Sequence, residues 1–170
     1  LRAEVDNWRW AGVPFYMRTG KRMRERSSEI VIQFKHAPFN IFADIGQNLS
    51  ANTLLIKLQP NEMITLSLMH KRPGLNEVSL GEVPLNLSLE SSFAAVRRRI
   101  AYERMLLDVL HDNPALFVRR DEVEASWQWI DGIVEGWRAA GVKVKPYDAG
   151  SLGPTAAIAL TERHGHSWRE

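Results

Sequence analysis

The chain has 170 residues, of which 45% are hydrophobic, and a formal net charge of +2. These proportions are typical of one globular domain that can bury a substantial core, and the small net charge argues against a nucleic-acid-binding tail. The absence of cysteine excludes disulfides and thiolate metal sites and fits a reducing compartment, while no apolar run is long enough for a transmembrane helix.

The N-terminus has neither an initiator methionine nor the layout of a signal peptide. We therefore expect the chain to be part of a longer polypeptide. The first feature after it is a cluster of cations around Gly20: Arg18, Lys21, Arg22, Arg24 and Arg26. Fixed cations in a turn between ordered segments can hold a small anion such as a phosphate, because they lose little freedom on binding. A solvated positive loop is the alternative, and composition alone favours it.

Four segments then alternate between apolar and more polar residues with a period of two: 29–35, 54–59, 63–69 and 85–89. This alternation predicts antiparallel strands with one apolar and one half-polar face. Turn signals at 59–62, 72–74 and Gly81-Glu82 separate the strands.

Apolar residues at helical spacing predict a helix over about 93–110 and a second that opens at Asp121 and stops near Gly141. In the first, Glu103 lies in the apolar arc, so we expect it to be paired, with Arg99 as the candidate. The second carries one apolar stripe, expected to be core: Val123, Trp127, Ile130, Val134 and Trp137. A last helix is predicted over 154–162.

Strands followed by helices, without βαβ alternation, predict an α+β fold: a largely antiparallel multi-stranded sheet with helices packed on one face. The half-polar face is then free to dock a second copy of the chain.

The sequence contains no dinucleotide-binding glycine motif, no Walker-type loop, no metal-ligand spacing and no arguable Ser–His–Asp set. His164 and His166 are expected to belong to a frayed polar end. From the residues alone, the chain is a binding or assembly domain with a candidate anion site and no catalytic group.

Blocks along almost the whole chain resemble the C-terminal half of glucose-6-phosphate dehydrogenases. They occur in family order: 6–15, 18–21, 32–34, 59–62, 101–104, 107–109, 117–122, 146–147 and 153–154. The resemblance identifies residues 1–170 as the substrate-binding and oligomerisation domain of that family.

The resemblance implies a cytoplasmic enzyme that oxidises glucose 6-phosphate to the 6-phosphogluconolactone and reduces NADP, at the entry to the pentose phosphate pathway. It assigns substrate contacts to Lys21 and Arg26, and to Gln59 in the sugar-phosphate region. It also implies a homodimer or homotetramer, with no metal, no nucleic acid and no membrane as partners.

The same resemblance places the NADP-binding Rossmann domain and the catalytic histidine upstream of this chain, so no catalytic residue is assigned within it. We expect the fragment alone to be inactive. Animal members bind a second, structural NADP through cations, and the matching positions here are uncharged: Ser27, Val31 and Leu152. We therefore expect this second site to be absent, with Arg18 supporting the substrate loop instead.

Two alternatives remain at this point. The chain could be a non-catalytic protein of the same fold that binds a phosphorylated metabolite or serves in assembly. A nucleic-acid binder that uses residues 18–26 and 97–99 is the less favoured alternative, because the sequence lacks the basic-aromatic motif of a known module.

Overall fold

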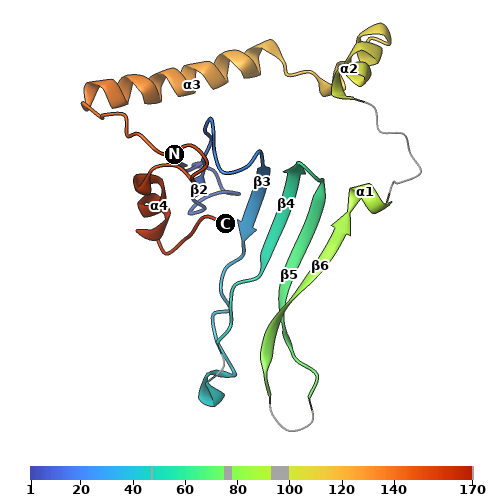
Figure 1. Cartoon of the computed structure of the whole chain (residues 1–170), viewed down its shortest axis with the longest axis vertical. Helices are drawn as coiled ribbons and strands as arrows, with labels where there is room; N and C mark the ends of the chain where they lie inside the picture. The colour runs from blue at the N-terminus through green and yellow to red at the C-terminus, as the bar shows by residue number, and fades with distance from the viewer. Residues whose placement is uncertain (47, 75–77, 93–99, 170) are drawn as a thin grey trace. The chain divides into compact units, whose positions relative to one another are not determined.

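The computed structural model describes residues 1–46, 48–74, 78–92 and 100–169 (Figure 1). They form two compact units, the first from Leu1–Ala94 with Tyr147–Glu170 and the second from Ala95–Pro146. Strands and helices follow each other as the sequence predicts, so the α+β class is confirmed. The assignment of 1–170 to one domain stays a prediction.

The first unit is built on a four-stranded antiparallel sheet in the order β3-β4-β5-β6. Its strands are β3 (Ser28–Gln33), β4 (Thr53–Gln59), β5 (Met63–Lys71) and β6 (Leu80–Ser88). A small second sheet pairs β1 (Arg2–Ala3) with β2 (Phe15–Tyr16). Two helices, α1 (Leu89–Ser92) and α4 (Thr155–Glu162), and a 3-10 turn, η1 (Ala43–Ile45), complete the unit.

The strand register confirms the predicted difference between the two faces of the sheet. Cross-strand partners share a face, so Ile32, Leu54, Leu66 and Leu85 form one apolar row across all four strands. The opposite face carries the row Val31, Leu55, Thr65 and Asn86, and the Thr65 hydroxyl donates a 2.8 Å hydrogen bond to the Asn86 amide oxygen. The sheet is therefore two-faced as the alternation predicts.

Many apolar side chains of this sheet are exposed to solvent. Leu55, at 6% exposed, is the only large apolar side chain that is buried among the described residues. Ile30 and Leu85, on the apolar face, are 49% and 55% exposed. Apolar surface of this extent is typical of a sheet that is completed by further protein.

One predicted turn is wrong. Gly81 and Glu82 lie inside β6, and the connection from β5 closes earlier, where the Arg72 amide donates a 2.7 Å hydrogen bond to the Ser79 carbonyl. A Cβ atom at position 81 would stand 2.4 Å from Nε of Arg72. The glycine therefore makes room for the Arg72 side chain, which approaches it from the end of β5.

The second unit contains α2 (Ala101–Leu110), the 3-10 turn η2 (Pro114–Leu116) and α3 (Arg120–Ala139). Residue Ile100 before α2 is extended, and residues 93–99, with the suggested Arg99 partner of Glu103, lie outside the described residues. Helix α3 begins one residue earlier than predicted, because the carboxylate of Glu122 accepts the Arg119 amide at 3.1 Å. Gly141, with φ of +63°, ends it as predicted.

The apolar stripe on α3 was predicted to be core, and the described residues of its own unit do not bury it. Trp127 is 62% exposed and Trp137 is 46% exposed. Burial of the stripe therefore requires surface beyond its own helix. The prediction that the helices pack on one face of the sheet stays a prediction.

Candidate anion-binding site

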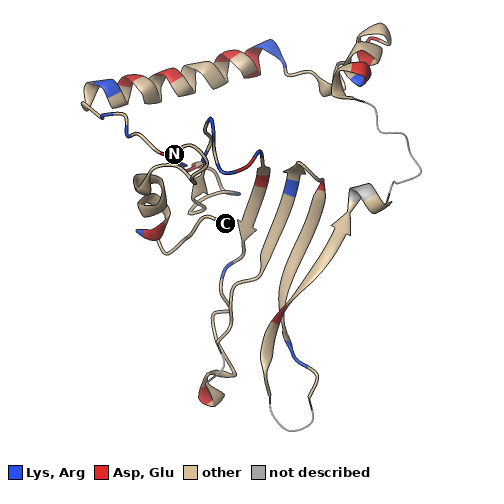
Figure 2. Ribbon diagram, viewed as in Figure 1, with Lys and Arg blue, Asp and Glu red and all other residues tan. Residues whose placement is uncertain are grey.

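The basic loop, residues 18–26, leads from β2 into β3 and is paired with a segment far along the chain. The Gly150 amide donates to the Arg22 carbonyl at 2.8 Å, and the Arg24 amide donates to the Ser151 carbonyl at 3.0 Å. Figure 2 marks the basic residues on the segment that leads into β3. The loop is thus a fixed turn of the first unit, as a site built from cations requires.

The centre of the loop is tied by a side chain. The Tyr147 hydroxyl donates a 2.7 Å hydrogen bond to the Lys21 carbonyl. A Cβ atom at position 20 would lie 2.9 Å from Sδ of Met23 and 3.0 Å from the same hydroxyl. Close approach of these groups explains why a glycine precedes Lys21.

Arg18 contacts the C-terminal segment, and the supporting role that the resemblance implies for it stays a prediction. Its guanidinium lies 4.5 Å from the centroid of the Trp168 ring and donates to the Leu152 carbonyl at 3.4 Å. The Trp168 ring is fixed in turn, because its Nε1 donates to the Ala157 carbonyl at 2.8 Å. Arg18 therefore connects the base of the loop to the C-terminal segment.

Arg26 and Gln59 lie at the same end of the β3–β4 pair. Ser28 pairs with Gln59, and the Ser27 hydroxyl contacts the Gln59 carbonyl at 3.4 Å. The peptide bond from Gln59 to Pro60 is cis. The structure thus brings Gln59 next to the residue that follows Arg26, while Lys21 lies earlier in the same braced loop.

The cations predicted to bind substrate are accessible. Lys21 and Arg26 are both exposed, and neither side chain forms an ion pair within the described part of the chain. An ammonium and a guanidinium can together bind an anionic, oxygen-rich ligand, with the guanidinium offering a planar fork.

The C-terminal segment corrects another prediction. His164 and His166 are not a frayed end: both rings lie against Tyr16, with centroids 6.1 and 5.5 Å away. Nδ1 of His166 is 3.2 Å from the Gln33 amide oxygen, and Arg169 forms a 2.8 Å ion pair with Glu29. These contacts join residues more than a hundred positions apart, so a local sequence pattern cannot predict them.

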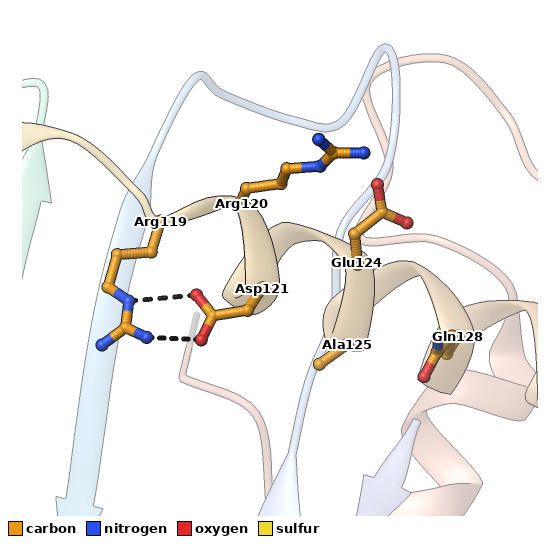
Figure 3. A pocket seen from close by; sticks show the side chains of 6 residues that line it. All are labelled: Arg119, Arg120, Asp121, Glu124, Ala125 and Gln128. Atoms are coloured by element: carbon orange, nitrogen blue, oxygen red, sulfur yellow. Dashed lines mark hydrogen bonds and ion pairs between the residues drawn. The ribbon is translucent and has the colours of Figure 1, made fainter.

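The second unit has an open hollow on the first turns of α3 (Figure 3). It measures about 660 Å³ and is lined by Arg119, Arg120, Asp121, Glu124, Ala125 and Gln128. Nε of Arg119 donates to the Asp121 carboxylate at 3.0 Å, so part of its positive charge is already compensated. All its walls come from one helical segment, and it lacks the convergent groups of a binding site.

The described residues offer neither a metal centre nor a membrane-spanning helix. No group of three or more histidine, cysteine or acidic side chains there could hold a metal ion. None of the described helices has the length and apolarity needed to cross a membrane. The basic loop therefore remains the candidate site.

A sequence profile described as glucose-6-phosphate dehydrogenase, C-terminal domain, matches residues 1–169. The chain belongs to this family. The glucose-6-phosphate 1-dehydrogenase of Rhizobium meliloti (strain 1021) is 56% identical over 170 residues, which are 100% of this chain and 34% of that protein. That of Mycolicibacterium smegmatis (strain ATCC 700084 / mc(2)155) is 47% identical over 168 residues, 99% of this chain and 34% of its own length.

Solved structures of the family share the fold. A glucose-6-phosphate dehydrogenase in complex with its substrate glucose 6-phosphate superposes with a TM-score of 0.84 at 30% identity, covering 99% of this chain and 34% of that chain. The Mycobacterium avium glucose-6-phosphate 1-dehydrogenase gives 0.76 at 29% identity, covering 100% of this chain and 34% of its own. This chain thus spans about a third of the length of these relatives, and the resemblance drawn from its sequence blocks is confirmed.

Proposed function

We propose that this chain is the substrate-binding C-terminal part of a dehydrogenase that oxidises D-glucose 6-phosphate to 6-phospho-D-glucono-1,5-lactone and reduces NADP. This is the first step of the oxidative pentose phosphate pathway. The observation that carries the proposal is a braced loop with two accessible cations, Lys21 and Arg26, in a chain of this family. A solved relative that binds glucose 6-phosphate supports the choice of ligand.

In this proposal, three side chains of the chain bind the substrate. Lys21 supplies a compact ammonium and Arg26 a planar guanidinium for the anionic sugar phosphate, and Gln59 supplies an amide. The proton on the sugar hydroxyl and the hydride go to groups of the other domain, which holds the catalytic histidine and NADP. The chain itself binds the sugar phosphate and orients it for the reaction.

The direct test uses the full-length protein that contains this chain. Glucose 6-phosphate should drive NADP reduction at 340 nm, whereas glucose should not do so at the same concentration, because it lacks the phosphate that the cations bind. Binding of glucose 6-phosphate without any turnover would instead favour the non-catalytic alternative, a protein of this fold that binds a phosphorylated metabolite.

We also propose that the chain has no second, structural NADP site. Such a site needs cations for the phosphates, and Ser27, Val31 and Leu152 supply none. The nearby guanidinium of Arg18 is already used by the Leu152 carbonyl and the Trp168 ring. Titration of the 170-residue chain with NADP in a calorimeter should therefore show no tight binding, and a submicromolar dissociation constant would contradict this expectation.

We propose further that two or four copies assemble through a face of the sheet, in the cytoplasm. The open sheet supports this assembly: Val31, on the half-polar face, is 46% exposed. Val31→Asp in the full-length protein should lower the sedimentation coefficient, because a charge buried in an interface is costly to desolvate. Val144→Asp is the matched control, because Val144 is 96% exposed; equal assembly of both variants and the parent would refute docking at this face.

A further inference from the structure

Tyr147 contacts the basic loop at the residue that matters most for the proposed function. Its hydroxyl donates a 2.7 Å hydrogen bond to the carbonyl of Lys21, across 126 positions of sequence. In the part of the chain that the structure describes, this is the only side-chain hydrogen bond made to residues 19–25. The contacts at Arg22 and Arg24 join backbone to backbone, and the Arg18 side chain holds only the base of the loop.

The hydroxyl also lies close to the loop backbone at Gly20. A side chain at position 20 would reach within 3.0 Å of it, so the chain turns closely over the tyrosine at Gly20. The tyrosine itself is 38% exposed, so it is not a buried core residue. The hydrogen bond therefore acts on the loop backbone at Lys21.

We infer that Tyr147 is a positioning residue for substrate binding, acting through the Lys21 backbone. The inference rests on the proposed function, in which Lys21 contacts the phosphorylated sugar. A lysine side chain has four flexible carbons, so its ammonium is well placed only if its backbone is fixed. Fixing the backbone before the ligand arrives lowers the entropy lost on binding.

The first measurement is the steady-state kinetics of Tyr147→Phe in the full-length enzyme. Loss of one neutral hydrogen bond should raise KM for glucose 6-phosphate about three- to tenfold. It should leave kcat and KM for NADP unchanged, because the ring and the fold are kept. Ser167→Ala is the matched control: it also removes one hydroxyl, from an exposed residue of the C-terminal segment.

A double-mutant cycle tests whether Tyr147 acts through Lys21. If it does, Tyr147→Phe should have no further effect on KM in a Lys21→Ala background, because no ammonium is left to position. The same fold-change in both backgrounds would overturn the inference, as would an unchanged KM in the single variant.

Limited trypsin digestion gives a result that does not depend on activity. Release of the loop backbone in Tyr147→Phe should speed cleavage after Lys21 and Arg22, read by mass spectrometry, while Ser167→Ala is cleaved at the parent rate. Faster cleavage in a protein that does not oxidise glucose 6-phosphate would uphold the positioning contact and refute the proposed function. An active enzyme in which neither cleavage nor KM changes would uphold the function and refute the positioning role.

Discussion

Lys21→Ala in the full-length enzyme should raise KM for glucose 6-phosphate about 10- to 100-fold. A charge-assisted hydrogen bond between the ammonium and an anionic ligand contributes roughly 1.5–3 kcal/mol, and each 1.4 kcal/mol is tenfold in affinity. KM for NADP should not change, because the coenzyme is assigned to the other domain. Arg26→Ala should act in the same direction through loss of its planar fork. Steady-state kinetics with glucose 6-phosphate as the varied substrate measure both effects.

Arg24→Ala is the control for this prediction. It removes the same charge from the same exposed loop, but at a position for which solvation is the expected role. The Arg24 amide still pairs with the Ser151 carbonyl in this variant, so the loop keeps its course. Equal rises in KM for Arg24→Ala and Lys21→Ala would show that the loop acts through its general positive charge, which contradicts specific contacts at Lys21 and Arg26.

The isolated 170-residue chain should give no NADP reduction above background with glucose 6-phosphate. Its sequence contains no dinucleotide-binding glycine motif. Removal of the sugar proton needs a general base near the substrate. In the structure, His164 and His166 are engaged with Tyr16, and the resemblance assigns no catalytic role to the other three histidines.

This loss of activity is informative only if the fragment is folded. Circular dichroism should show both helix and strand, and the full-length protein should turn over under the same conditions. Sustained turnover by the folded fragment would contradict the assignment of the catalytic histidine and NADP binding to the other domain.

The strands of the sheet could be predicted because its two faces differ chemically. Apolar residues at alternate positions of β4 and β5 face one way. This period of two comes from the strand backbone and does not depend on what packs against the sheet. The start of α3 was predicted to within one residue because its first turn contains acidic residues. Local patterns of this kind carry their information within a few positions of sequence.

The rest of the site depends on contacts between distant segments. Pairing of Arg22 with Gly150, the hydroxyl of Tyr147 on Lys21, and the stacking of Arg18 on Trp168 join the two ends of the chain. The supporting role of Arg18 was predicted only through family resemblance. The same resemblance included Tyr147 in block 146–147 but did not indicate its contact with Lys21. Gly81 was wrongly predicted to be in a turn for a related reason. The residue that requires a glycine there is Arg72, which is close in space but nine positions away in sequence.

Equilibrium binding of glucose 6-phosphate to the full-length protein, measured by calorimetry without NADP, tests the central claim most directly. The parent protein should bind glucose 6-phosphate, and the variant with both Lys21→Ala and Arg26→Ala should bind it at least 100-fold more weakly. The variant with both Arg22→Ala and Arg24→Ala, which removes the same charge, should keep nearly the parent affinity. Parent-like affinity in the Lys21 and Arg26 double variant would contradict the assignment of the substrate site to this loop.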